Sequence, residues 1–220
     1  MTLREEIRLT GIVLLAADVG DYDRRLVILT KERGKITAFA RGAKRSRSAL
    51  RAACNPFVCG TFILAEGRDA YTLYDAEVRE YYDRIGGNIE NACYASYFAE
   101  FANYYGQENL ESGEMVDLIA AALRALLAGK MPKPLIRRVY ELRLMGINGE
   151  YTPEPPGKCG ESAVYAWQFT LSRPVPKLFS FLLTETTMTE FSGAVDRLIR
   201  HFVDRSFKSL DVLRMMDGEA

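Results

Sequence analysis

The spacing of apolar residues changes once along the chain, and that change constrains the fold more than any single motif. Up to about residue 79, apolar and polar residues alternate with the period of two that is typical of β-strands, as in IRLTGIVLL at residues 7–15. From about residue 87, apolar residues recur with the period of an α-helix. The sequence therefore predicts an α+β protein, with a β-domain at residues 1–80 and an α-helical domain at residues 81–220.

Five strand-like segments occupy the first 80 residues. They are rich in β-branched and aromatic residues, are separated by Gly, Asp and Asn, and lie at residues 7–15, 24–30, 35–43, 57–67 and 70–78. Closing short strands into a barrel leaves no strand edge exposed. We therefore expect a small five-stranded barrel, and an SH3-like barrel fits the pattern almost as well as other small barrels.

The second part of the chain reads as a helical domain. Helices are predicted at residues 88–106, 112–129 and 134–146, followed by a proline-rich loop at residues 151–162. The stretch around Trp167 and Phe169 is expected to be extended. Two further helices are predicted at residues 177–190 and 194–216.

A strongly basic segment stands out in a chain whose net charge is zero, with 29 basic and 29 acidic residues. Between residues 31 and 51, eight lysines and arginines accompany Glu32 as the single acid. On an alternating strand Lys35, Phe39 and Arg41 share one face, so an aromatic ring lies between two cations. Phosphates of single-stranded nucleic acid pair with cations while bases stack on rings, so this segment is a candidate nucleic-acid site. The alternative is a solvated hairpin in which Phe39 points into the core. The candidate DNA-binding residues are Arg24, Arg25, Lys31, Arg33, Lys35, Phe39, Arg41, Lys44, Arg45, Arg47 and Arg51.

Several other functions are disfavoured by what the sequence lacks. No apolar run approaches the roughly 18 residues of a membrane span, and the N-terminus has no signal-peptide core, so a cytoplasmic protein is expected. The four cysteines form no CxxC pair and are expected to be reduced. There is no phosphate-binding loop, dinucleotide fingerprint or paired-carboxylate motif, and the single histidine, His201, has no catalytic partner motif. We therefore expect a protein that is not an enzyme.

The basic segment and its surroundings resemble the N-terminal signature of the bacterial recombination mediator family RecO. That family begins with a T-G-x-V-L strand and continues through an acidic turn and a Gly-Lys turn to a short basic segment before a serine. The matching positions are Thr10, Gly11, Val13, Leu14, Thr30, Gly34, Lys35, Ala40, Arg41, Gly42, Ala43, Lys44, Arg45 and Ser48. The stretches YELRLMGINGEYTP and DRSFKSLDVL resemble later parts of the family, so the similarity covers nearly the whole chain.

The resemblance implies an OB-fold followed by an α-helical domain and a role without catalysis. It implies binding of single- and double-stranded DNA, annealing of strands coated by single-strand-binding protein (SSB), and assistance in recombinase loading. The partners implied are DNA, RecR and the C-terminal tail of SSB, in the cytoplasm and at the nucleoid when DNA is bound. The alternative from the residues alone is an OB-fold adaptor that binds RNA or an acidic protein; an enzyme with a site around the tyrosines is a further alternative.

One departure from the family concerns zinc. Many members carry four cysteines after the YELRLMG helix, whereas residues 151–176 of this chain retain Cys159 alone, with Pro156 where its partner would stand. A structural zinc requires four ligands. We therefore expect neither zinc nor another cofactor, with packing around Trp167 and Phe169 in place of the metal.

A second candidate site lies on the helix at residues 134–146. The SSB tail is acidic and ends in a phenylalanine carboxylate, so it needs an apolar pocket beside a guanidinium. Arg138 is the first candidate for that guanidinium, with Arg137 and Arg143 as weaker ones, beside a stripe that includes Leu142. The alternative is that Arg143 forms a buried ion pair with an acid such as Glu100.

Overall fold

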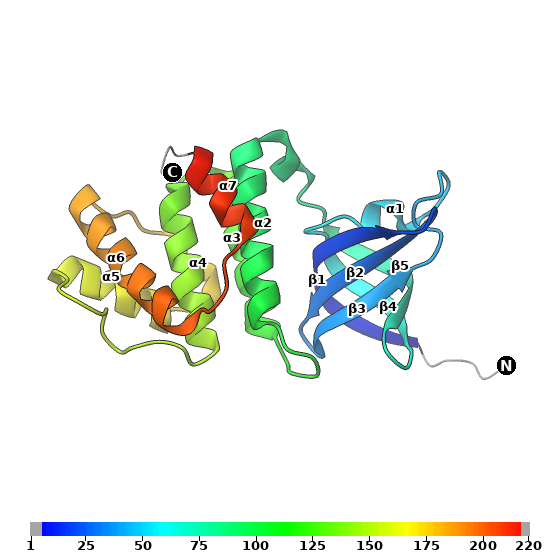
Figure 1. Cartoon of the computed structure of the whole chain (residues 1–220), viewed down its shortest axis with the longest axis horizontal. Helices are drawn as coiled ribbons and strands as arrows, with labels where there is room; N and C mark the ends of the chain where they lie inside the picture. Colours follow the sequence, from blue (N-terminus) through cyan, green and yellow to red (C-terminus); the bar gives the residue numbers. More distant parts are fainter. Residues whose placement is uncertain (1–5, 217–220) are drawn as a thin grey trace. The chain divides into compact units, whose positions relative to one another are not determined.

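The first part of the chain folds into a closed β-barrel (Figure 1). In the computed structural model, which describes residues 6–216, the strands are β1 (Glu6–Val19), β2 (Asp23–Thr30), β3 (Gly34–Ala40), β4 (Cys59–Glu66) and β5 (Tyr71–Glu80). Their order around the barrel is β1-β2-β3-β5-β4, and β3 pairs with β5 in parallel while the other pairs are antiparallel. This five-stranded Greek-key barrel confirms the predicted OB-fold.

Two glycines allow the strands to close. Gly11 on β1 lies opposite Gly60 on β4. A Cβ atom on Gly11 would lie 2.2 Å from the carbonyl oxygen of Leu29, and one on Gly60 would lie 2.3 Å from that of Glu77. Neighbouring backbones thus approach more closely at these points than a side chain permits. The T-G-x-V-L motif therefore has a structural reason for its glycine.

The core of the barrel comes from every second residue of its strands. On β3, Ile36, Ala38 and Ala40 are buried in a cluster with residues such as Leu26, Phe62 and Leu64. The residues between them on β3 lie on the outer face, because side chains alternate along a strand. Phe39 is one of these and is only half-buried, so the alternative in which it points into the core is wrong.

The helices that follow are α2 (Ile89–Tyr105), α3 (Gly113–Ala128), α4 (Lys133–Ile147), α5 (Glu161–Ser172), α6 (Glu185–Phe202) and α7 (Lys208–Met216). A short helix, α1 (Leu50–Ala53), lies between β3 and β4 at one end of the barrel (Figure 1). The α+β class is thus confirmed. Within residues 6–216, no helix combines the length and apolarity that crossing a membrane requires.

The chain divides into two compact units whose border is not the single cut predicted at residue 80. The barrel unit runs to Asp83 and also includes Ala102–Val116, the connection between α2 and α3 with their adjoining turns. The helical unit consists of Arg84–Phe101 and the described residues from Asp117 onward. Backbone hydrogen bonds tie the connection to the β2–β3 turn: Lys35 N donates to Gln107 O, and Asn109 N donates to Arg33 O, both at 2.9 Å.

Two expectations about the C-terminal part were wrong. The stretch around Trp167 is the helix α5, in which Ala163, Ala166, Trp167 and Thr170 form a buried helical stripe. Residues 178–184 are not helical, and α6 begins only after Thr184. The hydroxyl of Thr184 caps α6 by accepting a hydrogen bond from Thr187 N. In α5, aromatic and β-branched residues favour a strand locally, and the packing of its buried stripe overrides that preference.

The helical unit is built around aromatic rings. Tyr97 and Phe101 on α2 contact Phe207, and Phe98 packs against Tyr140 on α4 with ring centroids 4.4 Å apart. Phe207 lies in the break between α6 and α7. The predicted single helix at residues 194–216 is therefore interrupted at residues 203–207, where the buried Phe207 ring enters the core.

Candidate nucleic-acid interface

The basic loop, residues 41–51, leaves β3 and returns to the start of α1. It contains Arg41, Lys44, Arg45, Arg47 and Arg51. Two hydrogen bonds tie it to the β1–β2 turn: Lys44 N donates to Tyr22 O at 2.9 Å, and Gly42 N donates to Asp23 Oδ1 at 2.8 Å. The loop therefore has a defined path beside that turn.

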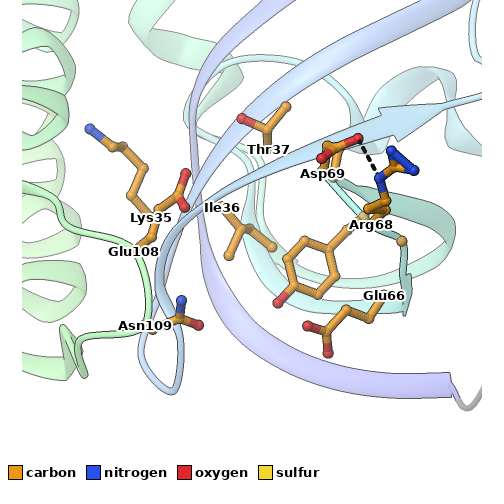
Figure 2. Close-up of a pocket in the computed structure, with 11 residues that line it drawn as sticks. Lys35, Ile36, Thr37, Glu66, Arg68, Asp69, Glu108 and Asn109 are labelled. Carbon is orange, nitrogen blue, oxygen red and sulfur yellow. Dashed lines mark ion pairs between the residues drawn. The ribbon is translucent and has the colours of Figure 1, made fainter.

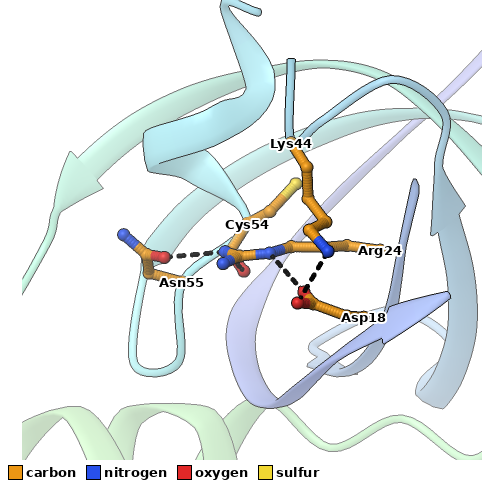
Figure 3. A network of polar contacts seen from close by, with 5 residues as sticks. All are labelled: Asp18, Arg24, Lys44, Cys54 and Asn55. Carbon is orange, nitrogen blue, oxygen red and sulfur yellow. Dashed lines mark hydrogen bonds and ion pairs between the residues drawn. The ribbon is translucent and has the colours of Figure 1, made fainter. Parts of the chain in front are cut away.

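Asp18 anchors two of the predicted cations (Figure 3). Its carboxylate lies 2.9 Å from Lys44 Nζ and 3.3 Å from Arg24 Nε. The hydrogen bond from Lys44, together with the charges of Lys44 and Arg24, outweighs the opposing effect of burial and lowers the pKa of Asp18 below its usual value. Asp18 is therefore ionised at neutral pH and neutralises charge that the sequence analysis assigned to DNA.

Arg24 also holds the far end of the basic loop. Its guanidinium donates to the carbonyl oxygen of Cys54 at 3.2 Å and to Asn55 Oδ1 at 2.8 Å. These acceptors follow α1, so Arg24 on β2 joins the end of β1 to the segment after α1 (Figure 3). Arg24 and Lys44 thus shape the loop, and their charges are engaged within the protein.

The exposed cations of the basic loop and of β2 are all arginines, namely Arg25, Arg41, Arg45, Arg47 and Arg51. Arg25 lies opposite Phe39 in the β2–β3 register, and Arg41 follows Phe39 two residues later. The guanidinium of Arg45 lies over the Tyr22 ring, 5.2 Å from its centroid. The basic loop and the outer face of β2–β3 therefore present guanidinium groups around half-buried and exposed aromatic rings.

Lys31, Arg33 and Lys35 lie elsewhere. They occupy the β2–β3 turn and the first residues of β3, and the six residue steps of that strand separate them from the basic loop by about 20 Å. The side chain of Lys35 donates to Asn103 O at 2.8 Å, and Ser112 N donates to Lys31 O. Counting residues 31–51 as one patch was therefore wrong, because an extended strand carries its two ends apart.

The predicted SSB-tail residues on α4 take part in a buried network. Arg138 is 8% exposed and contacts Glu141 Oε2 at 3.0 Å and Asp196 Oδ1 at 2.7 Å. Glu141 is fully buried and also accepts a hydrogen bond from the hydroxyl of Tyr97 at 2.6 Å. Burial, with the charge of Glu141 added, raises the pKa of Tyr97 well above its usual value, so this hydroxyl stays protonated and donates.

The apolar stripe beside Arg138 faces the interior. Leu142 is fully buried, so its predicted place in an open pocket for the tail is wrong. Arg137 lies 3.5 Å from Glu141 on the same helix. Arg143 donates to the carbonyl oxygen of Leu171, and Glu100 accepts hydrogen bonds from Ser209. The apolar residues at helical spacing on α4 therefore form a buried face of that helix.

Hydrogen bonds from α6 hold the loop around Cys159. Arg197 Nε donates to Pro156 O at 2.7 Å, and Gly160 N donates to Glu190 Oε2 at 2.9 Å. Within residues 6–216, no group of three or more His, Cys, Asp or Glu side chains is placed to hold a metal ion. A guanidinium near a lone thiol does not fit zinc, which needs four donors. Two residues of α6 thus hold this loop.

Sequence reasoning missed Asp18, Tyr22, Glu190 and Arg197. Asp18 lies at the end of β1 and Tyr22 in the turn that follows it, a stretch that the alternation pattern marked only as a turn. Acidic residues beside a basic loop are a usable signal for such an anchor. Glu190 lies 30 residues after Gly160 and Arg197 lies 41 residues after Pro156, and nothing in the pattern joins them.

The comparisons with known proteins agree on both parts of the chain. Residues 1–82 match the family model described as Recombination protein O N terminal, and residues 86–154 match Recombination protein O C terminal. A DNA repair protein RecO from Alkaliphilus metalliredigens is 31% identical over 166 residues, which cover 74% of this chain and 67% of the relative. One from Acetivibrio thermocellus is 25% identical over 245 residues, covering 96% of this chain and 97% of the relative. One from Anaeromyxobacter sp. is 37% identical over 150 residues, covering 66% of this chain and 58% of the relative. The chain, as its N-terminal signature predicted, belongs to the RecO family.

Proposed function

We propose that this protein acts in DNA repair by recombination, binding single- and double-stranded DNA with the basic loop and the outer face of β2–β3. Relatives named DNA repair protein RecO support the repair role. The role is one of binding and strand annealing, without a catalytic step. In this role the protein anneals complementary strands coated by SSB and, together with RecR, assists recombinase loading.

The observation that carries this proposal is the outward position of Phe39 between guanidinium groups. Arg25 pairs with Phe39 across the sheet, and Arg41 begins the basic loop directly after the end of β3. Arginine binds phosphate through two parallel hydrogen bonds, and an aromatic ring stacks with any base. Because the ring accepts any base, this face can hold strands of different sequence, as annealing of arbitrary complementary strands requires.

We also propose the SSB tail and RecR as partners of this protein. On α4, a carboxylate of the tail would compete with Glu141 and Asp196 for Arg138. Arg138→Ala therefore tests whether that network opens: tail-peptide affinity falls while DNA affinity stays unchanged if α4 is the site. Unfolding of the variant would instead identify the network as structural.

Annealing of SSB-coated complementary strands tests the proposed function. The triple variant Arg41→Ala, Arg45→Ala, Arg47→Ala should lose most of the annealing rate of the wild type. A matched variant that removes three exposed arginines elsewhere, Arg79→Ala, Arg200→Ala, Arg205→Ala, should retain it. Equal rates for the two variants would count against the basic loop as the DNA site, and preferential binding of RNA over DNA would favour an RNA adaptor.

A further inference from the structure

The barrel unit contains a pocket of about 380 Å³ at the end of β3 away from the basic loop (Figure 2). Its walls come from Lys35–Thr37 on β3, from residues 66–71 around the β4–β5 turn, and from Glu108 and Asn109 in the α2–α3 connection. All these segments belong to the barrel unit. The pocket is therefore defined within one compact part of the protein.

Incomplete pairing between β3 and β5 creates this pocket. The two strands pair only at Ala38 with Tyr71 and at Phe39 with Thr72. Before Ala38, the edge of β3 meets the α2–α3 connection instead, through the bridge between Gly34 and Glu108. The space between that connection and the β4–β5 turn stays open because no strand fills it.

The pocket combines an apolar floor with an acidic rim. Ile36 is 4% exposed and forms part of the floor, and Tyr71 contributes a half-buried ring. Burial raises the pKa of Tyr71, and the carboxylates of Glu66 and Glu108 raise it further, with Arg33 acting against them. Glu66 and Glu108 thus line the same pocket although they come from different segments (Figure 2).

The charges of the pocket select against phosphate. Three carboxylates line it, those of Glu66, Asp69 and Glu108, against the cations of Lys35 and Arg68. Arg68 lies 3.9 Å from Asp69, and Lys35 donates to Asn103 O. Carboxylates accept hydrogen bonds, so the pocket suits a flat ligand whose edge carries N–H donors.

We propose that the pocket binds one base of the strand held by the basic loop and prefers cytosine, whose exocyclic amino group donates to Glu66 or Glu108. This inference rests on the proposed DNA-binding function. Carboxylates pair with the cytosine amino group, whereas thymine has a carbonyl oxygen at that position. From Arg41 to Thr37 the strand spans about 13 Å, which about four nucleotides cover at a spacing of 3.4 Å. One oligonucleotide therefore reaches both the basic loop and the pocket.

The test compares oligo-dC with oligo-dT. Labelled strands of about twelve nucleotides, within the site sizes of OB-folds, are titrated with protein at about pH 8 and followed by fluorescence anisotropy. The wild type should bind oligo-dC about fivefold or more tightly, as expected for one base-edge contact. Glu66→Ala and Glu108→Ala, together and singly, should bring the ratio of the two affinities towards one.

Glu111→Ala is the matched control, because it removes one exposed carboxylate from the α2–α3 connection outside the pocket. It should keep the wild-type preference, which separates base reading from a general change in charge. Circular dichroism confirms that each variant is folded. Equal affinity of the wild type for both strands, or a preference that survives in the double variant, would overturn the inference and leave the proposed function standing. Failure of the wild type to bind either strand at low salt would overturn both.

Discussion

The salt dependence of DNA binding should report how many arginines contact phosphates. Five arginines are exposed on the basic loop and on β2, namely Arg25, Arg41, Arg45, Arg47 and Arg51. Each phosphate neutralised on a single strand contributes about −0.7 to the slope of log K against log salt concentration. Five contacts therefore give a slope of roughly −3.5. The triple variant Arg41→Ala, Arg45→Ala, Arg47→Ala should retain two contacts and a slope of roughly −1.4.

Lys44 and Arg47 both lie in the basic loop, but their replacement should affect the salt dependence of DNA binding differently. Lys44 carries the same charge as Arg47, but its ammonium group lies 2.9 Å from Asp18 and is not offered to a phosphate. Arg47→Ala should flatten the slope by about 0.7, and Lys44→Ala should change it by less than about half of that. The sequence alone treats the two residues as equivalent.

Fluorescence anisotropy of a labelled oligo-dT at a series of KCl concentrations measures these slopes. Thermal melts of each variant verify that the barrel remains folded. If Lys44→Ala flattens the slope as much as Arg47→Ala, the ion pair with Asp18 opens on binding and our reading of the anchor is wrong. If the triple arginine variant keeps the wild-type slope, the basic loop does not contact DNA.

Three further predictions concern the rest of the molecule. Elemental analysis should find well below one zinc per chain, and a chelator should not change the melting temperature; stoichiometric zinc would show that the loop around Cys159 binds metal in another conformation. Glu141→Ala should destabilise the protein by about 3–5 kcal/mol in urea unfolding, because it leaves the buried Arg138 guanidinium short of a partner; a loss below about 1 kcal/mol would show that water or Asp196 compensates. Burial raises the pKa of Cys54 to about 11 from an ordinary value of 9.0, so its contribution to stability should be lost as pH rises from about 9 to 11. Alkylation of native protein at about pH 8 should leave Cys54 unmodified, and rapid labelling would contradict its burial.

Local pattern was sufficient for the strands and for most of the helices. The five predicted strands overlap β1 to β5. Side chains on a barrel wall point alternately into the core and outward, so apolar residues recur at every second position of the sequence. The pattern failed at α5, whose aromatic and β-branched residues prefer strands but pack as a helical stripe around Trp167. It also failed at residues 178–184, where apolar residues occur without a helix. The failure at α5 lies where tertiary packing overrides local preference.

The sequence by itself determined the change from strands to helices, the basic loop with its flanking aromatic residue, and the family. These properties depend on residues close together in the chain or on signatures read in order. Only the tertiary structure decided which cations are available. Asp18 pairs with both Lys44 and Arg24, and the last turn of α2 engages the Lys35 side chain through Asn103, 68 residues away. Only the structure showed that the stripe beside Arg138 is buried and that the loop at Cys159 is held by Glu190 and Arg197. Charge can be counted along a chain, but its availability depends on partners that folding brings from elsewhere in the sequence.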